Sequence, residues 1–488
     1  MKRSFADILA GLDGDRAHKL VRKLPEWAAA GVEIPTALSL EQCSSTLTAR
    51  YKAELIANLA PRSGQLPPEV SSGAACPVQD LSEAKAPSGA ATECQQDFPK
   101  EVAATQSPGK AGYAPFIGGS AKRWGFGLSN PPVRSILDLT GGLGVDSWAF
   151  AHVAERVVYY ERDPELAAAA ERNFARLGAD RIEVRCETVT PETGLPEADL
   201  IYADPARRDA AGRKVFLLED CTPDILTLLP MLLQKAPAVL LKLSPMADLA
   251  MLAERLGPAL REIHVVEAGG EVKELLCLLS AELLSAGQVP RPGKEIVLAS
   301  LRKCPPGASC PAENASILRI QAEDERNAKV VYATGVQPGE VLLEPCPALL
   351  KAGAFRLPCG RWSLRKLAPS SHFYLLPGAI DASSAPCVPK NNVPGAKKAP
   401  SAPGDGLPEE AAPWFKPWRV RDVLPFGAAA FKELRQRFPQ AEITARNLPL
   451  RSDALRKKMG IAPGGDTHIF GCRLADGSAV LLVCEPIF

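Results

Sequence analysis

The sequence ILDLTGGLG, which covers residues 136–144, is the clearest structural signal in this chain. It reads as an apolar strand that ends in an acid, Asp138, followed by a glycine-rich turn and by a helix that begins near Val145. Glycine lets the backbone approach a ligand closely and adopt positive φ angles. We therefore expect a side chain at Gly142 or Gly144 to collide with a cofactor laid across the strand end, although such a turn can also be purely structural.

A second acid follows at a distance that suits the binding of a ribose. The run from Val157 to Glu161 predicts a strand whose terminal carboxylate stands 17 residues beyond Gly144. In nucleotide-binding folds a ribose-binding acid follows the glycine loop by roughly 20 residues. Glu161 can therefore accept hydrogen bonds from both ribose hydroxyls, and the alternative is a solvated acid at the end of a strand.

Two residues favour S-adenosylmethionine over NAD as the ligand of this turn. A dinucleotide loop reads Gly-x-Gly-x-x-Gly, whereas Ser147 stands in the place of the third glycine. Asp138 precedes the loop, where a carboxylate would repel a diphosphate but could hold the cationic methionine end of a sulfonium donor. The sequence therefore predicts a site for a methyl donor.

Short apolar runs alternate with helical stretches around this motif. Strands are predicted at residues 135–139, 157–161, 182–185, 200–203, 238–243 and 262–266. This alternation predicts an α/β, Rossmann-like core in which helices cover both faces of a parallel sheet. More closely spaced strand-like runs between residues 295 and 343 predict a small α+β unit. A helix at 428–438 and a hairpin at 468–484 predict another unit at the end of the chain.

Composition divides the 488 residues into blocks. Helical spacing of apolar residues predicts an N-terminal helical segment over residues 1–60. Stretches rich in proline, serine, glycine and alanine predict a low-complexity insert at 61–118 and a disordered linker at 379–412. The donor-binding domain is then expected at 119–288, the small α+β domain at 289–378 and the last domain at 413–488.

The motifs of the middle block, with YADPARRD at residues 202–209, resemble those of class I methyltransferases. These enzymes have an acid followed by Gly-x-Gly, an acid at the end of the second strand, and Asp or Asn-Pro-Pro-aromatic after the fourth. The resemblance implies a donor site in which Glu161 holds the ribose and Glu187 lies near the adenine. In full, the implied donor-binding residues are Asp138, Thr140, Gly142, Gly144, Glu161 and Glu187.

The same resemblance implies a catalytic set of Asp204, Pro205 and Arg207. In amino-methylating relatives the acid and a backbone carbonyl accept hydrogens from a planar amine, and the aromatic residue stacks on the base. Here Ala206 and Arg207 replace the second proline and the aromatic residue. Arg207 and Arg208 offer planar, charged donors that can hold a phosphate or stack on a base, which makes Arg208 a candidate substrate-binding residue. A structural ion pair with a nearby acid is the alternative.

Further phrases, at residues 40–52, 138–147, 204–209, 218–224 and 446–466, resemble a bacterial group of these methyltransferases. Its members carry a small ferredoxin-like domain and a C-terminal THUMP-like domain. The resemblance implies that the helix around residues 44–52 packs over the donor pocket. It also implies that residues 290–376 form the ferredoxin-like unit and that the last domain is THUMP-like.

The charge of the last block suits a nucleic acid. The chain as a whole has a net charge of +1, but residues 413–460 hold eleven Lys and Arg against four Asp and Glu. A basic module can hold a phosphate backbone without reading sequence, which is the role that a THUMP-like domain implies. Arg456, Lys457 and Lys458 are therefore candidate RNA-binding residues. A solvated basic face without a ligand is the alternative.

Other site classes are not supported by the sequence. Thirteen cysteines include no Cys-x-x-Cys pair, and five dispersed histidines suggest no metal site. Since no run has the length and apolarity of a membrane span or a secretory signal, a cytoplasmic location is expected. The sequence thus predicts an S-adenosylmethionine-dependent methyltransferase that acts on a base nitrogen of tRNA or rRNA. A small-molecule or protein methyltransferase and a noncatalytic RNA-binding protein are the alternatives, and the oligomeric state stays open.

Overall fold

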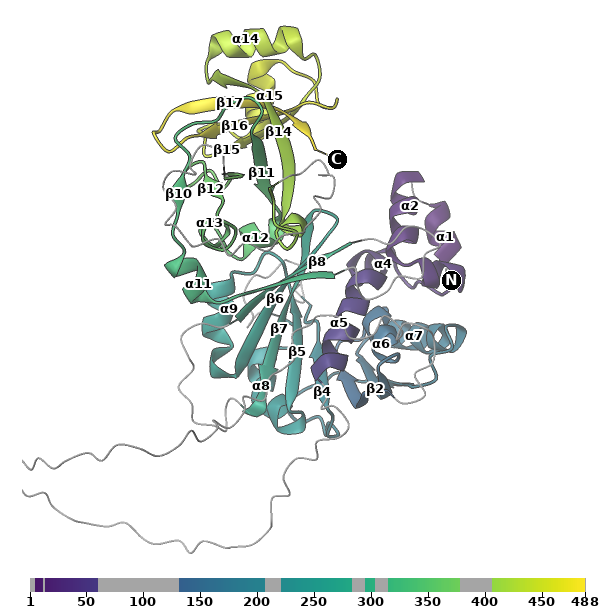
Figure 1. The fold of residues 1–488 in the computed structure, drawn as a ribbon. Helices are drawn as coiled ribbons and strands as arrows, with labels where there is room; N and C mark the ends of the chain where they lie inside the picture. Colours follow the sequence, from purple (N-terminus) through teal and green to yellow (C-terminus); the bar gives the residue numbers. More distant parts are fainter. Residues whose placement is uncertain are drawn as a thin grey trace, which may run out of the picture. The chain divides into compact units, whose positions relative to one another are not determined.

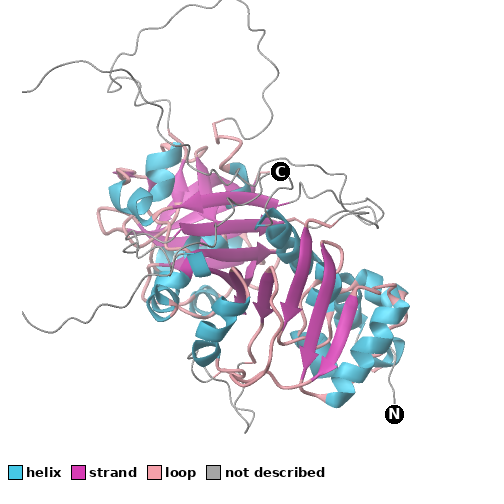
Figure 2. Cartoon of the chain, turned by 90° about the horizontal axis from the view of Figure 1, so that it is seen from below, coloured by secondary structure: helices cyan, strands magenta, loops and turns pink. Residues whose placement is uncertain are grey.

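Two β-sheets with flanking helices form the framework of the protein (Figures 1 and 2). The computed structural model describes residues 5–11, 14–59, 131–206, 221–282, 295–302, 315–377 and 406–487. Both predicted low-complexity stretches lie largely outside these ranges. The expected α/β class is confirmed, because strands and helices alternate through the middle of the chain.

The first sheet has nine strands in the order β3-β2-β1-β4-β5-β7-β6-β8-β9. Its strands are β1 (Val133–Asp138), β2 (Ala154–Glu161), β3 (Ile182–Cys186), β4 (Leu200–Ala203), β5 (Ala238–Leu243), β6 (Leu260–Ala268), β7 (Glu271–Ser280), β8 (Glu295–Leu301) and β9 (Ala315–Ile320). Strands β1 to β5 pair in parallel. The carboxyl ends of β1, β2 and β4 therefore meet at one edge, where Asp138, Glu161 and Asp204 are found.

The sheet is mixed and not purely parallel as predicted, because it contains β7, a strand that the sequence did not reveal. This strand runs antiparallel between β5 and β6, and it follows β6 through a hairpin turn at Gly269 and Gly270. Both glycines have the positive φ angles that a tight two-residue hairpin requires. The antiparallel β7 also distinguishes this sheet from that of the dinucleotide-binding fold, which is parallel and has the strand order 3-2-1-4-5-6.

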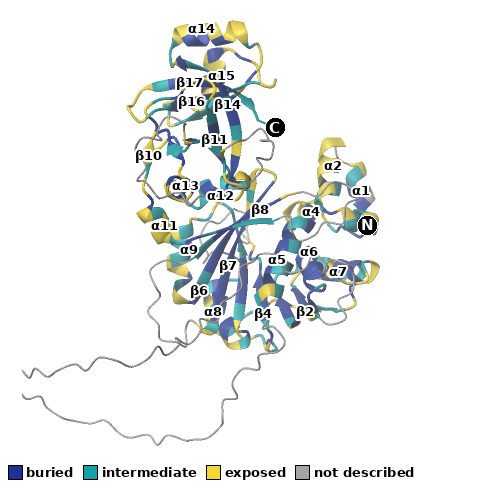
Figure 3. Cartoon of the chain, in the orientation of Figure 1, coloured by how far each residue is buried: buried dark blue, intermediate teal, exposed yellow. Residues whose placement is uncertain are grey.

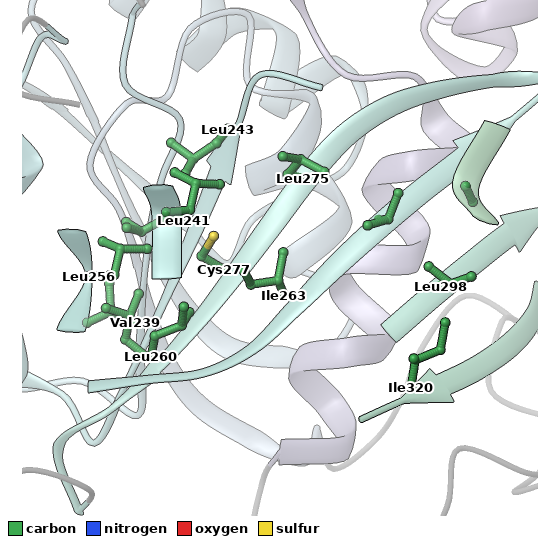
Figure 4. Close-up of a cluster of buried hydrophobic side chains, with 14 of the residues drawn as sticks. Val239, Leu241, Leu243, Leu256, Leu260, Ile263, Leu275, Cys277, Leu298 and Ile320 are labelled. Carbon is green, nitrogen blue, oxygen red and sulfur yellow. The ribbon is translucent and has the colours of Figure 1, made fainter. Parts of the chain in front are cut away.

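Strands β8 and β9 extend this sheet, although the sequence analysis assigned them to the unit that follows. β8 pairs in parallel with β6, and β9 pairs antiparallel with β8. Their apolar side chains join the core of the sheet, as Leu298 and Ile320 show in Figure 4 beside Ile263 of β6. Full burial of such a side chain stabilises the folded state by about 1.5–3 kcal/mol. This packing therefore stabilises β8 and β9 at the edge of the first sheet.

The predicted N-terminal helical segment is present as α1 (Phe5–Ala10), α2 (Gly14–Lys23), α3 (Pro25–Ala29), α4 (Ala37–Gln42) and α5 (Thr46–Leu59). α5 runs alongside α6 of the first sheet (Figure 1). The helices that flank this sheet are α6 (Val145–Phe150), α7 (Pro164–Arg176), α8 (Ile225–Lys235) and α9 (Leu249–Arg255). An aspartate caps the N-terminus of each of the last three, since its carboxylate accepts hydrogen bonds from free backbone amides.

The second sheet has eight strands in the order β10-β12-β13-β11-β14-β17-β16-β15. They are β10 (Val331–Tyr332), β11 (Val341–Pro345), β12 (Arg365–Lys366), β13 (Tyr374–Leu375), β14 (Phe415–Pro425), β15 (Glu442–Arg446), β16 (His468–Arg473) and β17 (Ala479–Pro486). Its helices are α11 (Ala322–Asn327), α12 (Pro347–Lys351), α13 (Leu357–Trp362), α14 (Ala428–Arg437) and α15 (Ser452–Met459). The predicted hairpin at 468–484 is β16 and β17. β14 pairs with both β11 and β17, so one sheet joins the two units that the sequence separates.

The strands of both sheets consist largely of buried residues (Figure 3). In β5 the alternate residues Val239, Leu241 and Leu243 point into one core cluster, which Figure 4 shows together with Leu275 and Cys277 of β7. The period of two follows from the pleat of a strand. The only charged residue in β5 is Lys242, which breaks this apolar run close to the edge that holds Asp138 and Asp204.

Candidate active site

A large cavity lies at the edge of the first sheet where β1, β2, β4 and β5 end. Its volume is about 1790 Å³, and its walls include Asp138, Glu161 and Asp204. Eight of the nine residues expected at the donor and catalytic sites line it: Asp138, Thr140, Gly142, Gly144, Glu161, Glu187, Asp204 and Pro205. Helices α2, α4 and α5 add further lining residues. The N-terminal helices therefore lie over the pocket, as the family resemblance implied.

The glycine-rich turn connects β1 to α6 with the positive φ angles expected from its sequence. Gly142 has φ +56° and Gly144 has φ +91°. The turn is fixed by backbone hydrogen bonds, in which the Gly141 amide donates to the Tyr160 carbonyl at 2.8 Å and the Gly144 amide to the Gly141 carbonyl at 2.9 Å. These angles are in the left-handed region, which a glycine adopts without steric cost.

For Gly144 the reason differs from the one that the sequence suggested. A Cβ at Gly144 would lie 2.5 Å from Cζ of Phe174, and a Cβ at Gly141 would lie 2.0 Å from the ring of Tyr159. The protein's own aromatic side chains therefore exclude a side chain at these two positions. At Gly142 the nearest atom would be 3.8 Å away. Open space is thus left for a ligand only beside Gly142.

Asp138 is almost fully buried at the end of β1, where it organises the turn. Its carboxylate accepts hydrogen bonds from Oγ of Ser147 at 2.6 Å and from the amide of Thr140 at 3.1 Å. Burial, with a smaller effect of the neighbouring carboxylates of Asp146 and Asp204, raises the pKa of Asp138 to about 7, although the hydrogen bonds from Ser147 and Thr140 act to lower it. A cation bound close to this carboxyl group would lower its pKa, because a nearby positive charge favours the ionised form.

Glu161 ends β2 and is held by two backbone amides. The amide of Gly142 donates to Oε2 and the amide of Asp163 to Oε1, each at 2.8 Å. The side chain is half-buried and faces the cavity. Glu187 follows β3, is exposed, and donates its amide to the carbonyl of Glu161 at 3.0 Å. Both acids thus lie on the side of the cavity that holds the turn.

Thr140 connects the glycine-rich turn to the residues that follow β4. Its Oγ1 accepts a hydrogen bond of 2.6 Å from the backbone amide of Asp204, while its own amide donates to Asp138. The side chain of Asp204 is 36% exposed, and its Oδ2 forms an ion pair with Nζ of Lys242. Arg207 and Arg208, the other candidates from this motif, lie outside the described residues.

A buried group of charges beside Asp204 was missed by the sequence analysis. Nζ of Lys52 on α5 is fully buried and lies 2.7 Å from Oε1 of Glu274 on β7 and 3.2 Å from Oδ1 of Asp146 on α6. Asp146 also accepts hydrogen bonds from the hydroxyls of Ser44 and Tyr202, both at 2.8 Å. These residues come from four elements far apart in sequence, so no local pattern could reveal them.

Opposite charges inside this group shift the pKa values of its members. Burial alone would raise the pKa of Asp146, but Lys52 and Lys242 together with its hydrogen bonds lower it below the ordinary value. Burial would lower the pKa of Lys242, but the carboxylates of Asp204, Asp146 and Glu274 raise it above the ordinary value. Lys242 is therefore a permanent cation in the wall of the cavity.

The candidate RNA-binding residues of α15 differ in their surroundings, and none of them lines the cavity. The guanidinium of Arg456 pairs with Glu442 at 3.2 Å and with Asp453 at 3.4 Å. Lys457 and Lys458 are exposed, and Nζ of Lys458 lies 5.9 Å from the ring centre of Phe431. Ion pairs with acids also engage Arg421, Arg437 and Arg446. The free positive charge of this unit is therefore smaller than its sequence suggests.

The described ranges hold neither a candidate metal centre nor a candidate membrane-spanning helix. They contain no cluster of three or more His, Cys, Asp and Glu side chains placed to hold a metal ion. Within the same ranges, no helix combines the length and the apolarity that a membrane crossing needs.

Similarity to known proteins extends over both halves of the chain. Residues 342–381 match the family model of a ferredoxin-like domain, and residues 415–486 match the family model described as THUMP domain-like. The crystal structure of a candidate methyltransferase from Porphyromonas gingivalis W83 is similar over 99% of this chain and 94% of its own, with 27% identity and a TM-score of 0.62.

A curated relative matches a shorter part of the chain. It is ribosomal RNA small subunit methyltransferase J of Halorhodospira halophila, which is 33% identical over 98 residues. The match includes 20% of this chain and 35% of that enzyme, so the chain covers about a third of the length of this relative.

Proposed function

Since the chain has the fold and the domain order of class I methyltransferases with a ferredoxin-like and a THUMP-like domain, we propose that it methylates RNA with S-adenosylmethionine as the methyl donor. The proposed acceptor is a base nitrogen of rRNA or tRNA. One observation carries this proposal: the acids that end β1 and β2 share a single cavity with Asp204 after β4. Donor and acceptor groups can therefore meet in one cavity.

The residues on the β1 and β2 side of the cavity fit the donor. Gly142 leaves open space beside a positive-φ turn, and the buried carboxyl of Asp138 has a pKa of about 7 that a cationic ligand would lower. Glu161 would accept hydrogen bonds from the ribose hydroxyls, and Glu187 would lie near the adenine. When bound, the donor supplies an electrophilic methyl group. Thr140 and Gly144 would shape the turn that receives it.

The chain's own contribution to the reaction is mainly alignment. Methyl transfer is accelerated when the acceptor atom is held in line with the reacting carbon. Such positioning can lower the activation free energy by up to roughly 7–11 kcal/mol. Asp204 is fixed through its amide by Thr140 and through its carboxylate by Lys242. We infer that this carboxylate accepts a hydrogen from the acceptor nitrogen, that Pro205 shapes the backbone beside it, and that Arg207 and Arg208 contact the substrate.

Four observations support RNA as the substrate. The curated relative is named for its action on small-subunit ribosomal RNA, and the C-terminal unit matches a THUMP-like model. Lys457 and Lys458 present exposed positive charge on α15 of that unit. A cavity of about 1790 Å³ also exceeds the roughly 300–1000 Å³ of most small-ligand pockets. The extra space suits a nucleotide that is turned out of its stack, as base-modifying enzymes require. Such a substrate implies a cytoplasmic site of action.

Transfer of a radioactive methyl group tests the proposal. Purified protein is incubated with tritiated S-adenosylmethionine and with total cellular RNA, RNA-depleted extract or no acceptor, and Asp204→Ala is the control. Label that enters RNA with the wild type and is lost with Asp204→Ala supports an RNA methyltransferase. Label that enters only the depleted extract would move the acceptor to a protein or a small molecule. Failure to bind the donor would instead indicate a noncatalytic RNA-binding protein.

A further inference from the structure

We propose that α2 and α4 hold the RNA strand where the cavity opens, with phosphates beside the target nucleotide bound by Lys19 and Arg22 and a neighbouring base packed against Leu38. The partner is thus single-stranded RNA. This inference rests on the proposed function and adds to it the place where the substrate enters. It is carried by two exposed cations and an exposed leucine that line the cavity from two connected helices.

The three residues of this entry surface, Lys19, Arg22 and Leu38, lie at the opening of the cavity. Each of them lines the cavity and is also exposed to solvent, Leu38 by 50%. Lys19 and Arg22 are three residues apart on α2, so their side chains lie on one face of the helix. Only Leu20 of this helix is buried, and most of the other residues are exposed (Figure 3). α2 therefore presents two cations at the opening.

Hydrogen bonds and an ion pair connect α2 to α4. Nζ of Lys23, the last residue of α2, donates to the carbonyls of Leu40 at 2.9 Å and of Glu41 at 2.8 Å. The guanidinium of Arg16, also on α2, pairs with the carboxylate of Glu41. The cations of α2 and Leu38 of α4 are therefore parts of one connected surface.

The positive charge of Lys19 and Arg22 suits a phosphate backbone. Three acids that line the cavity near α2 are each paired with another basic residue: Glu26 with Arg50, Glu41 with Arg16, and Glu271 with Lys273. Lys273 and, with a smaller effect, Lys19 lower the pKa of Glu271, so the charge of Lys19 also acts at the start of β7. RNA brings one negative charge for each phosphate, which complements the two cations of the entry surface.

An exposed leucine beside two cations favours an unpaired strand over a duplex. In a duplex the bases are stacked on one another, and the protein contacts mainly phosphates and 2′-hydroxyls. In a single strand a base can leave the stack and pack against an apolar side chain. The strand must also deliver one nucleotide into the cavity, and this is easiest where the nucleotide is unpaired. Leu38 can then contact the base next to the one that is delivered.

The first test measures RNA affinity at several salt concentrations. Fluorescence anisotropy follows the binding of a labelled oligouridylate, either single-stranded or paired with oligoadenylate, to the full-length protein. We expect Lys19→Gln combined with Arg22→Gln to lower the slope of log K against log salt by about 1.4 for the single strand, since each phosphate contact adds about 0.7. Its affinity should fall roughly 20-fold at 0.1 M salt.

The matched control is Lys235→Gln combined with Arg255→Gln. These two residues lie in the last turns of α8 and α9, as Arg22 does in α2, and neither lines the cavity. The control should keep the wild-type slope and affinity.

The second test separates the apolar contact from the charges. Leu38→Ser should weaken binding of the single strand about fivefold without a change in slope, and it should leave the affinity for the duplex unchanged. Val331→Ser is the control, because Val331 is 57% exposed on β10 and does not line the cavity. An equal loss for single strand and duplex would contradict a contact between Leu38 and an unstacked base.

The outcomes separate this inference from the proposed function. The kcat/KM for RNA should fall with the affinity in the Lys19 and Arg22 variant, whereas donor affinity in calorimetry should stay unchanged. Methylation of RNA with a wild-type salt slope in that variant would overturn the inference and keep the function. Loss of donor affinity would also overturn it, by making these residues part of the donor site.

Two further results are informative. RNA binding that depends on the entry surface, in a protein that transfers no methyl to RNA, would keep the inference and reject the proposed function. Polyglutamate that binds through Lys19 and Arg22, while oligouridylate binds without them, would overturn the inference and assign this surface to an acidic protein.

Discussion

Phe174 on α7 fills the space that a side chain at Gly144 would need, since a Cβ there would lie 2.5 Å from its Cζ. Gly144 also has φ +91°. We therefore expect Gly144→Ala to destabilise the protein through a clash and a strained backbone, of which the backbone alone costs roughly 1–2 kcal/mol. Thermal denaturation measures the loss. Adding Phe174→Leu should recover only the part that is due to the clash.

Gly142 provides the matched comparison, because its turn has similar φ but open space beside it. Gly142→Ala should change the melting temperature less than Gly144→Ala and weaken donor binding more. If both variants lost stability equally and bound the donor equally, the open space at Gly142 would not be the donor site.

Donor affinity should depend on pH through Asp138. The pKa of this carboxyl is raised to about 7, so the donor-free protein holds it protonated below that pH. A cationic donor favours the carboxylate, and binding at lower pH must therefore release a proton. Affinity should rise as the pH increases towards 7 and then level off, with a change of up to about tenfold per pH unit on the acidic side.

Calorimetry in buffers of different ionisation enthalpy counts the released protons. Asp138→Asn cannot ionise, so its donor affinity should be weaker and nearly independent of pH. A wild-type affinity that stays constant across the same pH values would show that Asp138 does not face the positive end of the donor.

Lys52 should be important for stability. Its ammonium group is fully buried between Asp146 and Glu274. Lys52→Met leaves both carboxylates without their cation, and breaking a buried pair in this way costs about 3–5 kcal/mol. Lys273→Met is the matched control, because Lys273 pairs with Glu271 on the surface, where such pairs contribute about 0–1 kcal/mol. Similar unfolding midpoints for the two variants would contradict this role of Lys52.

The sequence predicted the parts of the fold that depend on local patterns. The bounds of β4 and β5 agree with the predicted strands, and the acids that end β1 and β2 lie at one cavity as expected. β7 was missed because its apolar residues show no alternation with polar ones. In the sheet it lies between β5 and β6, which the sequence analysis expected to belong to one parallel sheet. The limits of the domains stay predictions, and the membership of β8 and β9 in the first sheet favours an end of the donor-binding domain near residue 320.

The remainder of the site depends on contacts between distant residues. Lys52 and Glu274 are 222 residues apart and meet only through the packing of α5 against the sheet. The one local signal for Lys242 was a charged residue within the apolar strand AVLLKL at 238–243. A charge in such a strand requires a partner, and this rule could have identified Lys242 before the structure did.

Lys457 and Lys458 should contribute to RNA affinity through charge alone. Both are exposed on α15, whereas Arg456 beside them is paired with Glu442 and Asp453. Lys457→Glu combined with Lys458→Glu should weaken RNA binding and flatten its dependence on salt, because each lost phosphate contact lowers the slope of log K against log salt by about 0.7–0.9. Arg456→Gln should change the slope little, since its charge is already engaged.

The same charge reversal at Lys19 and Arg22, which are exposed on the cavity wall formed by α2, serves as the comparison. A slope that changes only with Lys19 and Arg22 would place the RNA backbone at the N-terminal helices instead of the THUMP-like domain.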